Sequence, residues 1–497
     1  MKRNILFYVA ILLFFGGGIY IILQAGAQPQ PVSVEEARPS PSPTPPAPAA
    51  SSEHRQPLTS FTVSFLQDNL RQPLSILLLQ IILIITAARL AGTLFLKIGQ
   101  PAVIGEMVAG ILLGPSVLGF LSPSALQFLF PPSSMETLRL LSQIGVIIFM
   151  FIVGMEINVR HLREKAESAI IISHASIIVP FFLGGTLALL IYPGLSGSGI
   201  SFTAFAPFMG IAMSITAFPV LARIIEEHGI AKSYLGSVAI ACAAIDDATA
   251  WCLLAMVVAL VRASAPGAAV FTILLALLFT AAMIFLFKPW LERLLDKRRK
   301  SATLNRGWVT VLLAFVFTSA LITEIIGIHA LFGAFLAGAV MPASAELRAH
   351  LRERLEAFSS ASLLPLFFAF TGLRTQINLL SDGNSWLLCA GVIGVAVVGK
   401  MGGSMLAARW TGMNWRDAFA IGALMNTRGL VELIALNIGY DLGVLPARIF
   451  AIMVLMALVT TAMTGPLLRL VNLYEREPLP TAARLDPPSG RGAAVSG

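Results

Sequence analysis

Two adjacent carboxylates, Asp246 and Asp247, lie in the middle of a long apolar run at residues 234–261. An Asp at the centre of a bilayer costs roughly 3 kcal/mol on insertion scales, so two in succession require water, a partner charge or an exchangeable ion. Successive helical residues point about 100° apart, so one Asp can face an ion path while the other meets a fixed partner. The pair therefore indicates ion or proton handling. The alternative is interhelical hydrogen bonding, for which one Asp would suffice.

Lys400 is the natural counter-charge, because it lies deep in another apolar run, with Gly399 and Gly403 beside it as a small-residue packing face. A buried ammonium needs a carboxylate partner. We expect Asp246 to be this partner and Asp247 to be the exchanging carboxylate, although spacing alone leaves the opposite assignment open. The alternative for Lys400 is an amine that reaches the membrane interface.

The elements that must position these residues are transmembrane helices. The 497-residue chain is 57% hydrophobic and only 12% charged, against about 25% charged residues in soluble domains. The fold class is therefore an all-α polytopic membrane protein. Under a criterion of about 20 residues per span, we expect about 13 spans. They lie at residues 74–96, 102–120, 137–155, 168–192, 202–224, 234–261, 267–288, 308–327, 328–342, 359–376, 386–409, 417–440 and 447–471.

Basic residues orient the spans, because Lys and Arg collect in cytoplasmic loops. They concentrate in alternate loops, for example at Lys97, residues 160–165, residues 297–300 and residues 348–354. The odd-numbered spans then run from outside to inside. The predicted location is the inner membrane of a bacterium, with the N-terminal tether outside and the C-terminal tail cytoplasmic.

The chain divides into four parts. Residues 1–27 carry Lys2 and Arg3, an apolar stretch and a small-residue end, so they are a signal peptide or an uncleaved anchor. Residues 28–72 form an exported Pro/Ser-rich tether and pre-helix segment. Residues 73–473 form the membrane domain, and residues 474–497 form a short cytoplasmic tail.

Two spans are interrupted in similar ways. The fifth is broken around residues 216–219, where Pro219 supplies no backbone donor, and the twelfth is broken at residues 426–429. They are seven spans apart and so have opposite orientations, which predicts two inverted-topology repeats with two discontinuous crossing helices. The discontinuous-helix site comprises Thr216, Ala217, Phe218, Pro219, Asn426, Thr427, Arg428 and Gly429.

Freed carbonyls and the Thr216 hydroxyl are hard oxygen donors, which suit Na⁺ or K⁺. Arg428 and Glu432, four residues apart, can form an internal ion pair or take part in transport. No cofactor is expected, and no metal beyond the transported monovalent cation. No nucleic-acid partner is expected either. An intramembrane aspartyl protease is disfavoured, because its two carboxylates must face each other from different helices. A channel or a transport-dead sensor on the same scaffold stays the alternative.

At these residues the chain resembles the second family of monovalent cation:proton antiporters, which includes sodium/proton exchangers, Kef-type potassium-efflux systems and plant cation/proton exchangers. The resemblance covers most of residues 74–471. The matching stretches are GQPAVIGEMVAGILLGPSVLG at 99–119, FMFIVGMEINVRHL at 149–162, SITAFPVLARI at 214–224, AIDDATAWCLLA at 244–255, LFGAFLAGAVMP at 331–342, FAFTGLRTQI at 368–377 and MNTRGLVELI at 425–434.

The resemblance implies a homodimer in which a core bundle moves against a dimerisation domain. It also implies alternating access of one carboxylate, Asp247, to protons and to Na⁺ or K⁺, with Li⁺ as a further candidate. Asp246 beside it and Lys400 match family positions. An Asp-Asp pair is associated in the family with electrogenic exchange.

Overall fold

The computed structural model describes residues 14–25, 69–70, 72–156, 166–195, 201–227, 229–230, 233–262, 266–298, 306–342, 348, 351–355 and 359–471. Within these ranges the structure is all helical and contains no strand. The helices before the first break are α3 (Pro73–Lys97), α4 (Ala102–Leu113), α5 (Leu118–Leu121), α6 (Pro123–Leu129), α7 (Pro132–Glu156), α9 (Ala166–Leu195) and α10 (Phe202–Ser214). Those in the middle are α11 (Phe218–Glu227), α12 (Tyr234–Arg262), α13 (Pro266–Ala282), η1 (Met283–Phe287), α14 (Lys288–Arg298), α15 (Arg306–Ile326) and α16 (Ala330–Ala339). The last group is η2 (Ser359–Leu363), α18 (Leu364–Arg374), η3 (Ile377–Leu379), α19 (Gly383–Val397), η4 (Val398–Gly402), α20 (Gly403–Trp410), α21 (Trp415–Met425), α22 (Leu430–Asp441) and α23 (Ala447–Leu470).

Each of the thirteen ranges expected to span the membrane contains helix. In the described part of the chain, ten helices are long and apolar enough to cross a bilayer, and the bent pair of α21 and α22 makes an eleventh. α16 and the η2–α18 segment are too short to meet this criterion. The all-helical polytopic fold is therefore confirmed, while the count of thirteen and the inverted repeat stay predictions.

Both expected breaks are present, and one of them begins earlier than expected. α21 ends at Met425 and α22 begins at Leu430, with a bend of 43° between them. α10 ends at Ser214 and α11 begins at Phe218, so Pro219 lies in the first turn of α11. A proline is tolerated there, because the first-turn amides have no intrahelical acceptor.

The two breaks touch each other in the interior. The backbone N–H of Ala217 donates to the carbonyl of Thr427 over 3.1 Å. Each unwound segment thereby satisfies a backbone group of the other, which a buried irregular segment requires.

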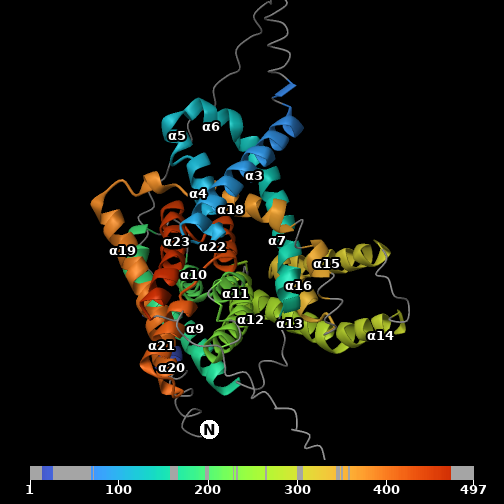
Figure 1. Ribbon diagram of the computed structural model, residues 1–497, viewed down its shortest axis with the longest axis vertical. Coiled ribbons are helices and arrows are strands. Elements are labelled where there is room, and N and C mark those ends of the chain that lie inside the picture. Colours follow the sequence, from blue (N-terminus) through green and yellow to red (C-terminus); the bar gives the residue numbers. More distant parts are fainter. Residues whose placement is uncertain are drawn as a thin grey trace, which may run out of the picture.

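The helices around the breaks form the centre of the molecule. In Figure 1, α13, α14 and α15 extend to one side and α19 lies at the opposite side, with α10, α22 and α23 between them. α9 packs against α10, α12 and α20, and α4 packs against both α3 and α18. The α4–α18 crossing is close because a Cβ on Gly110 would overlap the backbone of Ala369.

Several expectations fall outside the described residues. These are the cleavage site after Ala27, most of the tether at 28–72, the tail at 474–497 and the basic cluster at 160–165.

Candidate functional site

Asp246 lies at the centre of a buried polar cluster and is fully inaccessible to solvent. Its Oδ1 accepts a hydrogen bond from Ser173 Oγ at 2.5 Å. Its Oδ2 accepts hydrogen bonds from Ser176 Oγ at 2.6 Å and from Thr216 Oγ1 at 2.7 Å. Lys400 Nζ lies 3.0 Å from the same Oδ2. Four donors from α9, the first break and η4 therefore converge on one carboxylate, which offsets much of its loss of hydration.

Lys400 is equally buried and has its donors occupied. Besides Asp246, its Nζ donates to Ser176 O at 2.9 Å, to Ser176 Oγ at 2.8 Å and to the carbonyl of Ser214. Lys400 lies in the π-helical turn η4. Gly399 of the same turn faces Pro180 of α9, and Gly403, which begins α20, faces Val179 of α9. The absence of side chains on these glycines lets η4 approach α9, so that the ammonium reaches the carboxylate.

Two basic side chains cap the C-terminal end of α10, the helix before the first break. Arg428 Nη1 donates to the carbonyl of Ala212 and Arg428 Nη2 to that of Met213, both at 2.8 Å. Lys400 Nζ donates to the carbonyl of Ser214. These carbonyls lack intrahelical partners and form the negative end of the helix dipole. The buried break is therefore compensated electrostatically by side chains from two distant spans.

Arg428 also forms the internal ion pair with Glu432, at 3.2 Å and with both side chains fully buried. Arg428 lies in the unwound segment before α22, and Glu432 lies in the first turn of α22. A carboxylate in a first helical turn is favourable because it faces unpaired backbone amides.

Asp247 is 1% exposed and follows Asp246 on α12, so its side chain is turned about 100° around the helix. Hard oxygen atoms occur at both breaks. Thr216 Oγ1 lies 3.2 Å from Met425 O, and the buried Oδ1 of Asn426 accepts no hydrogen bond from any described residue. Thr427 Oγ1 donates to Thr464 Oγ1 at 3.3 Å, Gly429 is the N-cap of α22, and Phe218 and Pro219 begin α11.

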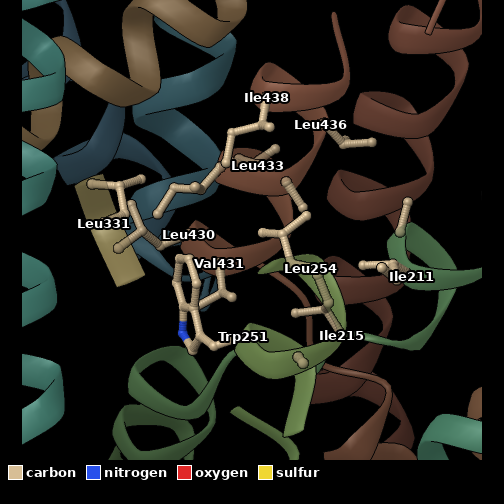
Figure 2. Packing of buried hydrophobic residues seen from close by; sticks show 14 of the residues in the cluster. Ile211, Ile215, Trp251, Leu254, Leu331, Leu430, Val431, Leu433, Leu436 and Ile438 are labelled. Atoms are coloured by element: carbon tan, nitrogen blue, oxygen red, sulfur yellow. The ribbon is translucent and has the colours of Figure 1, made fainter. Parts of the chain in front are cut away.

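An apolar cluster follows the carboxylates along α12. Figure 2 shows Trp251 beside Val431 and Leu430, with Leu254 close to Ile215. Trp251 is 2% exposed and stacks on Phe335, with 5.9 Å between the ring centroids. Trp251 lies one helical turn beyond Asp247, so this cluster separates the polar site from the end of α12 at Arg262.

Sequence reasoning missed Ser173, Ser176 and Ser214. Ser173 and Ser176 are three residues apart in an apolar run, and that spacing places two hydroxyls on one helix face. This pattern could have marked α9 as a polar partner of another span. The role of Ser214 depends on its backbone carbonyl, which has no signal in the side-chain pattern. Among the described residues, no group of three or more His, Cys, Asp or Glu side chains could hold a metal ion.

Comparisons with known proteins agree on one class. Residues 82–471 match the family model described as sodium/hydrogen exchanger, transmembrane. The Na(+)/H(+) antiporter NhaS4 of Synechocystis sp. is 44% identical over 402 residues, which cover 81% of this chain and 98% of that protein. The K(+)/H(+) antiporter 1 of Saccharomyces cerevisiae is 35% identical over 413 residues, which cover 81% of this chain and 47% of that protein. The match thus spans about half of the yeast relative.

A solved structure supports the fold. The sodium proton antiporter MjNhaP1 of Methanocaldococcus jannaschii matches with a TM-score of 0.58 and 13% identity, over 79% of this chain and 97% of that chain. The chain therefore belongs to the sodium/hydrogen exchanger family of transmembrane proteins. It is a multi-pass membrane antiporter of monovalent cations and protons, and not an enzyme.

Proposed function

We propose that this chain exchanges protons for Na⁺ or K⁺ by alternating access, with Asp247 as the carboxylate that both ions share. The observation that carries the assignment is that both side-chain oxygens of Asp246 already accept hydrogen bonds. Three hydroxyl donors and one ammonium already occupy its two oxygens. A proton or a cation would have to displace these donors, so Asp246 acts as a fixed anchor and the neighbouring Asp247 exchanges.

The surroundings of the pair suit a small, hard cation. Na⁺ and K⁺ prefer oxygen ligands, and the two breaks offer the Thr216 hydroxyl and the Asn426 amide oxygen. When Asp247 holds a proton it has lost the charge that attracts the cation. When it holds the cation, the proton is excluded. This competition couples the two fluxes without any further device.

Alternating access is supported by the apolar cluster around Trp251 and Val431 (Figure 2). A channel needs a continuous polar path, whereas these side chains close the route between the carboxylates and one end of α12. Ion release on that side requires the cluster to separate, which is a movement of packed helices rather than diffusion through a standing pore.

The predicted setting is the inner membrane of a bacterium, with the N-terminal tether outside and the C-terminal tail cytoplasmic. The alternation of basic loops supports this orientation. The likeness to the family supports a homodimer. The NhaS4 relative is named for Na⁺ and the yeast relative for K⁺, so both cations belong in the assay.

The test is cation-driven proton movement in liposomes that contain the purified protein and a pH-sensitive dye. Asp247→Asn preserves the shape of the side chain but cannot ionise, so we expect it to abolish the proton flux driven by Na⁺, Li⁺ or K⁺ gradients. Glu353→Gln is the matched control, because Glu353 is an exposed carboxylate that is remote in sequence from both helix breaks. We expect its flux to equal that of the unmodified protein.

Wild-type flux in Asp247→Asn would overturn the assignment of the exchanging carboxylate. A second arm clamps the membrane potential and records current. Current without proton movement would identify a channel and contradict exchange altogether.

A further inference from the structure

The apolar helix Phe14–Ala25 packs against α9. The ring of Phe15 meets that of Phe182 edge to face, with 5.1 Å between centroids and an angle of 77°. Ile22 is only 7% exposed and belongs to the same buried cluster as Ala188 and Ile191 of α9. A helix that did not pack against the rest of the protein would leave such side chains exposed, so this helix has a defined packing site on α9.

Close approach between the two helices depends on glycine. A Cβ on Gly18 would overlap the ring of Phe182, so that ring occupies the space that a side chain would fill. One turn further on, the position of a Cβ on Gly185 lies 3.9 Å from Ile22 Cγ2. Small residues that admit a neighbouring side chain are the usual means of helix association inside a bilayer.

The contacts also fix the direction of the helix. Gly18 meets Phe182 and Ile22 meets Gly185, so residue numbers increase together and the two helices run parallel. By the alternation of basic loops, α9 runs from the cytoplasm outward. The N-terminal helix then starts in the cytoplasm, where Lys2 and Arg3 are favourable, and ends outside, where the tether follows.

We propose that this segment is retained as an additional membrane helix seated on α9, and is not removed as a signal peptide. It precedes the residues that match the family, which begin at residue 82. α9 also carries Ser173 and Ser176, so the retained helix supports the element that positions two donors to Asp246. The Pro/Ser-rich tether is then an external loop joining two membrane helices.

The first test is the intact mass of the full chain, purified from membranes through a C-terminal tag. Retention gives the mass of the complete 53.0 kDa chain plus the tag. Cleavage after Ala27 would remove 27 of the 497 residues, which is about 3 kDa. Recovery of only the shorter chain would overturn the proposal.

The second test traps the contact. Ile22→Cys combined with Gly185→Cys places a thiol on each side of this contact, where the position of a Cβ on Gly185 lies 3.9 Å from Ile22 Cγ2, so we expect the two cysteines to form a disulfide. A protease site inserted in the tether then separates the N-terminal helix from the rest. We expect the fragments to stay joined on a non-reducing gel and to separate on a reducing gel.

The matched control pairs Ile22→Cys with Gly194→Cys, because a Cβ on Gly194 of α9 meets no atom within 4 Å. Its fragments should separate under both conditions. A second comparison adds Gly18→Leu or Gly17→Leu to the trapping pair. Gly18→Leu should reduce the disulfide yield severalfold, whereas Gly17→Leu should not, since a Cβ on Gly17 would meet no neighbouring atom within 4 Å. Separation of the Ile22–Gly185 pair without reductant, or equal yields from the two leucine variants, would refute the seat on α9.

Discussion

The energetic weight of the Lys400–Asp246 pair can be worked out from its burial. Both side chains are 0% exposed, and the ammonium and carboxylate are 3.0 Å apart. Removing one partner of a buried pair leaves an uncompensated charge and costs about 3–5 kcal/mol. The Arg262–Glu324 pair has a similar distance of 3.3 Å, but its side chains are 34% and 45% exposed. Exposed pairs contribute about 0–1 kcal/mol, so burial and not distance should set the difference.

The perturbation is a double-mutant cycle. Lys400→Met removes the ammonium and also leaves the carbonyls of Ser176 and Ser214 without this donor. Asp246→Asn leaves the ammonium without its counter-charge. The double variant contains neither charge, so we expect its loss of stability to be smaller than the sum of the single losses by about 2 kcal/mol, within the range found for contacting residues.

The assay is equilibrium unfolding in mixed micelles, followed by circular dichroism as denaturing detergent is added. A second cycle with Arg262→Met and Glu324→Gln serves as the control, and its coupling should stay below about 1 kcal/mol. Equal coupling energies in the buried and exposed cycles would refute the reasoning, because the effect could then not arise from desolvation of the pair.

Two further predictions concern the breaks and the helix crossings. Arg428→Met removes the donors to Ala212 O and Met213 O and leaves Glu432 buried without its cation, so the free energy of unfolding should fall by about 3–5 kcal/mol in the same titration. Adding Glu432→Gln should restore part of this loss, and no restoration would argue against the ion pair. Gly110→Ala forces a Cβ into the backbone of Ala369 and should destabilise the chain by about 1–3 kcal/mol. Gly391→Ala is its control, since a Cβ there meets nothing within 4 Å, and equal losses from the two variants would contradict the close crossing.

The sequence predicted the features that are determined within a single helix, namely where helices lie and where they are interrupted. Apolar runs placed helices in all thirteen ranges, and the interruption at residues 426–429 coincides with the gap between α21 and α22. Pro219 drew attention to the first break but did not locate it, because proline restricts the preceding residue and is also accepted in a first helical turn.

The remainder depends on which helices become neighbours. Lys400 and Asp246 are 154 residues apart, and their pairing could be suggested only because buried charges need partners. The contribution of Ser176, which bridges the two charges, follows from the packing of α9 beside η4. The π-helical turn at Lys400 likewise has no simple pattern in the residues, and it rotates the side chains that follow relative to a regular α-helix.

Thr461 of α23 forms hydrogen bonds with both backbone polar groups of Arg428 in the unwound segment. Its hydroxyl accepts from the backbone N–H of Arg428 at 3.0 Å and donates to the carbonyl of the same residue at 2.8 Å. One side chain thus replaces the two backbone bonds that a regular helix would supply, and valine, although similar in shape, could supply neither. The interruption between α21 and α22 is consequently held in place by hydrogen bonds. Because these two hydrogen bonds tie the start of α22 to α23, we expect a displacement of α22 to be transmitted to α23.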